Sequence, residues 1–73
     1  MRIFLIKHNY IDYDCHLGHI IVADNEKQVR KLAKINYRGE GKDIWNYAEV
    51  MEQGVYTGLR TKPFILLSDF NAG

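Results

Sequence analysis

The densest group of reactive side chains lies between residues 12 and 19. It holds two carboxylates, one thiol and two imidazoles: Asp12, Asp14, Cys15, His16 and His19. Thiolates and imidazoles are good zinc ligands, so part of this group could supply three ligands to a zinc ion. A structural zinc site would need further ligands, and the rest of the chain has no second cysteine and one other histidine. The spacing therefore favours a polar hairpin loop, and we predict no metal and no cofactor.

The same residues make a weak case for nucleophilic catalysis. Cys15 and His16 are adjacent, and neighbouring side chains on a strand point to opposite faces, so His16 is poorly placed to activate the thiol. His19 could reach it, but no glycine-flanked nucleophile turn or oxyanion hole accompanies the pair. The stretch Gly39-Glu40-Gly41-Lys42 lacks the spacing of a phosphate-binding loop. These patterns predict a protein that is not an enzyme.

Basic residues recur at spacings of three and four in the segment 26–38, which has a local charge of +4. Such a stripe could follow the phosphate backbone of a nucleic acid. No aromatic side chain is interleaved with it to stack on bases, and a charged outer face is also what a surface helix needs for solubility. Nucleic-acid binding is therefore an alternative rather than the favoured interpretation, and it would use Lys27, Arg30, Lys31, Lys34 and Arg38.

Aromatic residues are the candidate anchors for a protein partner, because tryptophan and tyrosine are enriched at the energetic centres of interfaces. The candidates are Trp45, Tyr47, Tyr10 and Tyr13. Trp45 has two interpretations. It could fold the segment 39–48 over the second face of a sheet as part of the core, or it could be exposed and anchor a partner.

The elements that must position these residues are set by three continuously apolar runs, at 3–6, 20–23 and 64–67. An apolar run on a strand is apolar on both faces, whereas one helix can cover only one of them. The surplus apolar surface points to binding rather than to catalysis. The pattern predicts strands at 2–10, 19–23, 49–57 and 64–68, with the third interrupted at Gly54.

One amphipathic helix follows the second strand. Asn25 is a good N-cap with Gln28 at the capping-box position, and Val29, Leu32 and Ala33 recur at helical spacing. Gly39 is the expected stop. A short helical turn at 43–48, capped by Asp43, is also expected. The order strand, strand, helix, strand, strand predicts a two-layer α+β domain with one helix on a four-stranded sheet. It would be β-grasp-like if the first and last strands paired in parallel.

The 73 residues predict a single domain, 1–73. The net charge of +1 gives no overall field that would attract nucleic acid or lipid, and no apolar run is long enough to span a bilayer. One cysteine suits a reducing compartment, and the start Met1-Arg2-Ile3 does not resemble a signal peptide. We therefore expect a cytoplasmic protein without membrane partners.

The ending Phe64-Ile65-Leu66-Leu67-Ser68-Asp69-Phe70-Asn71-Ala72-Gly73 resembles that of a loose group of small uncharacterised proteins from bacteria and phages. Further matches to this group are Tyr13-Asp14, the apolar run at 20–23, the Asn-capped helix and Trp45. The final Phe-Asn-Ala-Gly is the specific part, although Asp69 stands where the group runs from serine directly into phenylalanine. The resemblance implies a phage or prophage origin, no known activity and a role in binding a host protein.

A weaker resemblance is to ubiquitin-like carriers, through the start Met1-Arg2-Ile3-Phe4, the length and the terminal glycine. The segment after the last strand is short for a carrier tail, which usually ends Gly-Gly. The prediction is a non-enzymatic protein-binding module that contacts a host protein or a second copy of itself, through the bare sheet face or the strand edge beside it. Nucleic-acid binding and a ubiquitin-like carrier are the alternatives.

Overall fold

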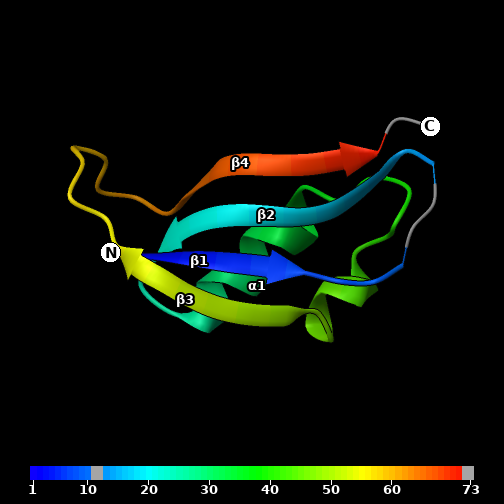
Figure 1. The fold of residues 1–73 in the computed structure, drawn as a ribbon, viewed down its shortest axis with the longest axis horizontal. Helices are drawn as coiled ribbons and strands as arrows, with labels where there is room; N and C mark the ends of the chain where they lie inside the picture. The colour runs from blue at the N-terminus through cyan, green and yellow to red at the C-terminus, as the bar shows by residue number, and fades with distance from the viewer. Residues whose placement is uncertain (11–12, 72–73) are drawn as a thin grey trace.

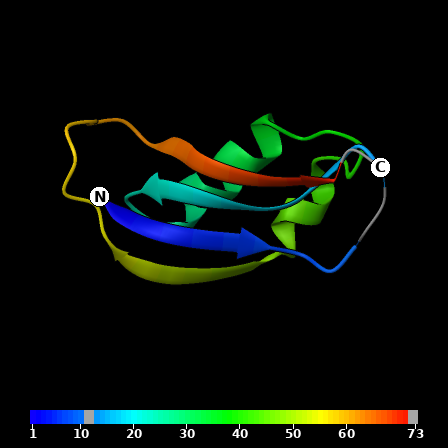
Figure 2. The same cartoon turned by 45° about the horizontal axis from the view of Figure 1, so that its top comes forward.

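The computed structural model describes residues 1–10 and 13–71, and it confirms the predicted two-layer α+β class. Four strands form one sheet, and the helical elements pack against one of its faces (Figures 1 and 2). The elements are β1 (Arg2–Lys7), β2 (Cys15–Ala23), α1 (Glu26–Ile35), the 3-10 helix η1 (Asp43–Asn46), β3 (Glu49–Val55) and β4 (Phe64–Asn71).

The strand order is β3-β1-β2-β4, and every pair of neighbours is antiparallel. The central hairpin of β1 and β2 is contiguous in the chain, and the two later strands are added at its outer edges. β1 and β4 are therefore separated by β2 and do not pair. The β-grasp arrangement, which requires these two strands to lie side by side in parallel, is not found among the described strands.

The ends of the hairpin differ from the prediction. β1 stops at Lys7 rather than at residue 10, and β2 starts at Cys15 within the expected loop 11–18. The start of β2 was hard to predict because of a β-bulge at Leu17, where the pairing with β4 shifts between His16 and Gly18. A bulge interrupts the alternation of side chains, so the sequence pattern there does not read as a strand. The same pairing extends β4 to Asn71, three residues beyond its predicted end.

The cap of α1 is confirmed. The Asn25 side chain accepts the backbone N–H of Gln28 at 2.9 Å, and the Gln28 side chain reaches back to accept the N–H of Asp24 at 2.7 Å. The predicted stop at Gly39 is wrong, because the helix ends at Ile35 with Asn36 as its C-cap. Gly39 instead donates its N–H to the Asp14 carbonyl, a close approach that a Cβ atom, 2.8 Å from that oxygen, would prevent.

The core lies between α1, η1 and the inner face of the sheet. It is formed by Phe4, Ile6, Ile21, Ala23, Val29, Ala33, Trp45 and Ala48. Trp45 is 0% exposed, so the partner-anchor interpretation of this residue is wrong. The other interpretation is wrong about its location, because η1 packs on the same side as α1 rather than over the second face (Figure 2). η1 is also shorter than expected, and Asp43 is its first residue rather than its cap.

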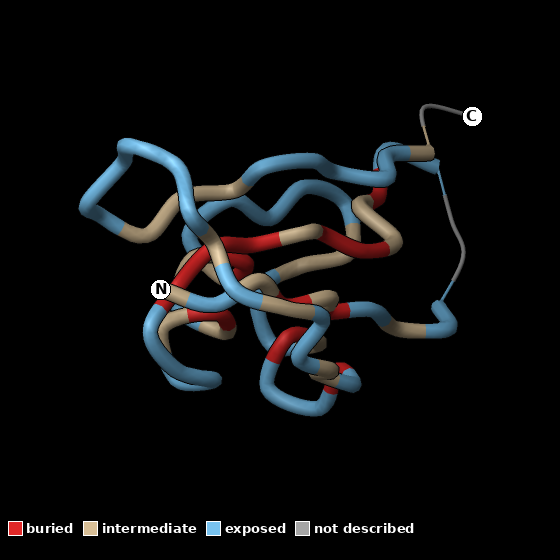
Figure 3. Tube along the Cα trace, turned by 60° about the vertical axis from the view of Figure 1, so that its left-hand side comes forward, coloured by how far each residue is buried: buried red, intermediate tan, exposed pale blue. Residues whose placement is uncertain are grey.

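No described helix or strand packs over the second face of the sheet, although Val22 on that face is fully buried. The central row of this face runs across all four strands through Met51, Leu5, Ile20 and Leu67, which are directly paired neighbours. Exposure is greatest on β4 and the connection before it, as Figure 3 shows. β3 carries the interruption expected near Gly54, where Gln53 is the extra residue opposite β1. We name this uncovered surface the open face.

Truncation of Trp45 should unfold much of the protein, because the indole fills the space between η1 and the sheet. We expect Trp45→Ala to lower the free energy of unfolding by about 3–5 kcal/mol, and Trp45→Phe to lower it less because a ring still fills most of the cavity. Urea unfolding followed by circular dichroism measures both. Equal unfolding midpoints for Trp45→Ala and the wild type would contradict this assignment.

Candidate functional site

The open face contains a groove of about 740 Å³ above β2. Its walls come from the flanking strands β1 and β4. Its open-face lining is Leu5, Lys7, Gly18, Ile20, Leu67 and Asp69. Leu67 is 67% exposed, whereas Leu5 and Ile20 are half-buried on the floor. We name this feature the open-face groove. It is within the size range of ligand-binding clefts and has the apolar floor and charged rim that such sites combine.

Gly18 forms the hollow of this groove. It lies directly between Lys7 on β1 and Asp69 on β4. A Cβ atom at Gly18 would stand 2.9 Å from the Ile6 carbonyl oxygen, so the close approach of β1 and β2 requires glycine here. Because Gly18 has no side chain, an indentation separates the Lys7 side chain on β1 from the Asp69 side chain on β4.

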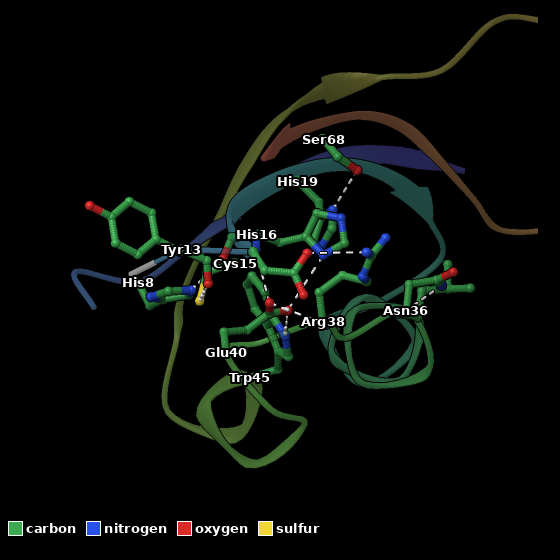
Figure 4. Close-up of polar contacts among 12 residues, drawn as sticks. His8, Tyr13, Cys15, His16, His19, Asn36, Arg38, Glu40, Trp45 and Ser68 are labelled. Atoms are coloured by element: carbon green, nitrogen blue, oxygen red, sulfur yellow. Dashed lines mark hydrogen bonds and ion pairs between the residues drawn. The ribbon is translucent and has the colours of Figure 1, made fainter. Parts of the chain in front are cut away.

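A histidine cluster lies below the groove, at the end of the sheet where β2 begins (Figure 4). His19 is 1% exposed, and its Nδ1 lies 2.7 Å from the Ser68 hydroxyl. Its ring contacts those of His16 and Trp45 at centroid distances of 4.7 and 4.9 Å. Burial away from water lowers the pKa of His19 to about 4, with a further lowering by the imidazoles of His16 and His8 against an opposing effect of Glu40.

Glu40 holds this cluster together through a fully buried carboxylate. Its Oε1 accepts the backbone N–H groups of His16 at 2.8 Å and Arg38 at 3.2 Å, and its Oε2 accepts the Trp45 indole N–H at 3.1 Å. Burial alone would raise the pKa of this carboxyl, but these donors outweigh it and the pKa is lowered. His16 Nδ1 lies 3.5 Å from Oε2 without a hydrogen bond. The carboxylate therefore stays charged and joins the 38–40 loop, β2 and η1.

His8 closes the cluster on the side of β1. Its Nδ1 accepts the backbone N–H of Tyr10 at 3.1 Å, so the proton is on Nε2, which donates to the His16 carbonyl at 2.6 Å. The ring also meets Trp45 edge to face at 4.9 Å. Each of these contacts is structural, and they fix the end of the sheet on which the groove is built.

The metal hypothesis finds no geometric support in the described part of the chain. Within residues 1–10 and 13–71, no three side chains of the ligand types come together as a metal site. Cys15 is buried and directs its thiol to the Tyr13 carbonyl at 3.3 Å, while His19 Nδ1 faces Ser68. Asp12, which belongs to the reactive group predicted at residues 12–19, lies outside the described residues.

The remaining aromatic candidates are exposed, but they lie at the end of the sheet rather than on the open face. Tyr47 is 88% exposed and lines a small depression with Lys7, His8 and Asn9. Tyr10 and Tyr13 are also exposed, at the end of β1 and before β2. The structure thus separates the tyrosines from the buried Trp45, and no single aromatic patch forms from these four residues.

The basic residues divide into two groups. Arg30 donates to the carbonyls of Trp45 and Ala48 at 2.9 and 2.8 Å and so ties α1 to η1, whereas Arg38 forms an exposed ion pair with Asp14 at 3.1 Å. The lysines instead line a second groove, of about 500 Å³, between the helical elements. Its lining is Lys27, Arg30, Lys31, Lys34, Ile35, Lys42 and Asn46, and we name it the α1–η1 groove.

No protein-family model, no curated protein and no solved structure matches the chain. The resemblance of its ending to phage and bacterial proteins therefore stays a prediction, and the last two residues that carry it lie outside the described part. None of the helices in the described ranges combines the length and the apolar character needed to cross a bilayer.

Sequence reasoning identified the surplus apolar strands but missed the residues that shape the sites. Lys7, Gly18 and Asp69 share one row because the pairing of β2 with β4 shifts between Ile20 and Ile21, where Leu66 is the extra residue, and such a bulge leaves no sequence signal. Glu40 was passed over because a glutamate between two glycines resembles an ordinary loop. Lys42 was missed because it joins the helix lysines only through the packing of η1 on α1.

The buried neutral His19 should make the fold less stable in mild acid. A histidine in the unfolded chain has a pKa near 6.5, so the unfolded state binds a proton that the folded state takes up only near pH 4. Stability contributed by the neutral ring is therefore present at pH 7 and is lost as the pH falls from 6.5 to 4. We expect a loss of about 2 kcal/mol between pH 7 and 5, measured by urea unfolding.

His19→Gln is the control, because it should remove most of this pH dependence whatever its effect on stability at pH 7. Glu40 does not interfere with this measurement. Its carboxyl has a lowered pKa in the folded state, so its contribution to stability is lost only as the pH falls below 4.5, the ordinary pKa of a glutamate. An unchanged slope of stability against pH in His19→Gln would show that another group titrates.

Proposed function

We propose that this protein is a protein-binding module and that the open face of its sheet is the contact surface. The observation that carries the proposal is the open-face groove, with its apolar row of Leu5, Ile20 and Leu67. The core is complete without this row, because α1 and η1 close the other face. Contiguous apolar surface that the fold leaves uncovered is typical of interaction sites.

The shape and charge of the groove support a protein partner rather than a flat apolar surface such as a membrane. A groove above β2 can receive a ridge of side chains, and Lys7 and Asp69 on its opposite walls can pair with charges of both signs. Contacts of this kind combine an apolar centre with a polar rim, which is the usual anatomy of a protein interface. A host protein, which the resemblance to phage proteins implies as the partner, is one class of partner that this proposal includes.

Photo-crosslinking tests the location of the contact. The crosslinking amino acid p-benzoylphenylalanine is placed at Leu67 on the open face or, as the control, at the exposed Tyr47 at the end of the sheet. On irradiation of cells that express the chain, we expect the Leu67 variant to give a discrete adduct that is identified by mass spectrometry. Leu5→Glu in the same groove should abolish it. Adducts from Tyr47 alone, or from neither position, would contradict the proposal.

A second function, binding of a nucleic-acid backbone, is favoured by one observation on the helical layer. No acidic side chain lines the α1–η1 groove, and within the described residues its four lysines have no ion-pair partner. Exposed carboxylates lie near it in sequence at Asp43 and Glu26, and Glu26 already pairs with Arg30. Because no aromatic ring lines the groove, the expected contacts are to phosphates and independent of base sequence.

Matched single-charge variants test this second function. Lys31→Gln removes a charge from the groove, and Lys62→Gln removes one from the β3–β4 connection outside it. For labelled single-stranded DNA, the slope of log affinity against log salt should become shallower by about 0.7 in Lys31→Gln and stay unchanged in Lys62→Gln. Fluorescence anisotropy over a salt series measures both. Equal effects of the two variants, or no binding by the wild type, would exclude the groove as a nucleic-acid site.

A further inference from the structure

Two neighbouring rows of the open face have a pattern that is complementary to itself. In the apolar row, Leu5 on β1 and Leu67 on β4 flank Ile20 on β2. In the next row, Lys7 on β1 and Asp69 on β4 flank Gly18 on β2. Directly paired residues of antiparallel strands point to the same face, so both rows are presented together. A cation lies on one side of β2 and a carboxylate on the other.

Within residues 1–10 and 13–71, no ion pair neutralises either charge of the second row. β1 and β4 are two strand spacings apart, about 9–10 Å, and Lys7 and Asp69 form no ion pair across the indentation at Gly18. Lys7 also faces Glu49 on β3, but in the described part of the chain neither Lys7 nor Asp69 has an ion-pair partner within 4 Å. Both side chains are exposed at the rim of the groove.

We infer that the occupant of the open face is a second copy of this chain, stacked face to face about a twofold axis that runs along β2. This inference rests on the proposed protein-binding function. The axis places β1 of each copy over β4 of the other and keeps every row opposite itself. Leu5 then meets Leu67 of the other copy, Ile20 meets Ile20, and Lys7 meets Asp69 twice, once on each side of the axis.

This arrangement satisfies the requirements of a symmetric interface. A twofold contact must use the same patch on both subunits, so that each pairing occurs twice, and the two rows meet this condition. Sheets that stack face to face lie about 10 Å apart with strands about 30° from parallel, which is close enough for leucine and isoleucine side chains to interdigitate. β3 lies outside the overlap, so Glu49 would not face Asp69 across the interface.

The size of the contact is also adequate. A standard interface buries roughly 800 Å² on each partner. The whole surface of this chain is 4859 Å², so such a contact would remove about a sixth of it. The open face is the sheet face available for this contact, because the opposite face is already covered by α1 and η1.

Charge exchange provides a test with an internal rescue. Lys7→Glu places two carboxylates opposite each other at both contacts, and Asp69→Lys places two ammonium groups there. We expect each variant alone to raise the dimer dissociation constant at least tenfold in sedimentation equilibrium, compared with a dimeric wild type. An equimolar mixture should form a heterodimer, because the two introduced charges are opposite and meet at one contact, while the native Lys7 and Asp69 meet at the other. The double variant should also recover dimerisation.

Two controls separate the interface from general effects of charge. Lys62→Glu changes the net charge by the same amount as Lys7→Glu but lies in the β3–β4 connection, so it should leave the dimer intact. Far-UV circular dichroism shows that the variants are folded, which matters for Lys7→Glu because the new carboxylate faces Glu49. Leu67→Glu, at an exposed position, should give a folded monomer.

The outcomes distinguish this inference from the proposed function. A wild type that stays monomeric at millimolar concentration overturns the dimer, yet an adduct between the Leu67 crosslinker and a different protein, lost in Leu5→Glu, would still support binding by the open face. If both single variants dimerise like the wild type, or if their mixture does not restore the dimer, the Lys7–Asp69 pairing is wrong. An absence of adducts and of dimers overturns both.

Discussion

A helix of ten residues is about 15 Å long and can lie on only one side of a sheet, and this constraint governs the rest of the molecule. α1 and η1 together close one face, where Trp45 and the apolar residues of β1 and β2 form the core. The strands are apolar on both faces. The strands that supply core residues to the covered face therefore also carry Leu5, Ile20 and Leu67 on the face that stays uncovered. The open face is thus a direct consequence of building a sheet of this composition with one helical layer.

The covered side depends on a single buried charge. Glu40 receives three hydrogen bonds, from β2, from its own loop and from the Trp45 indole, and so ties together parts of the chain that are far apart in sequence. Hydrogen bonds to a carboxylate are stronger than those between neutral groups, and they offset the cost of burying it. The neutral His19 completes this end with its own bond to β4. The polar residues here position this end of the sheet.

Much of the fold could be predicted from the sequence because its signals are local. Asn25 and Gln28 mark the start of α1, and the interruption near Gly54 is visible in β3. The hairpin end was misjudged because the Leu17 bulge shifts the phase of alternation, which no residue type announces. Trp45 was placed on the wrong side because a tryptophan in a loop has no periodicity to show which face it packs on. Gly39 resembled a helix stop but serves a tertiary contact with Asp14.

The order in which the strands enter the sheet also has a consequence for how the chain folds during synthesis. The central hairpin and α1 are complete in the first half of the sequence, and β3 and β4 then attach to opposite outer edges. No later strand has to be inserted between strands that are already paired, so no existing pairing must open. Until β4 arrives, however, the β2 edge exposes unpaired backbone groups beside an apolar strand. The pairing of β4 then closes the β2 edge against strands of other chains, a protection that any truncation before residue 64 would remove.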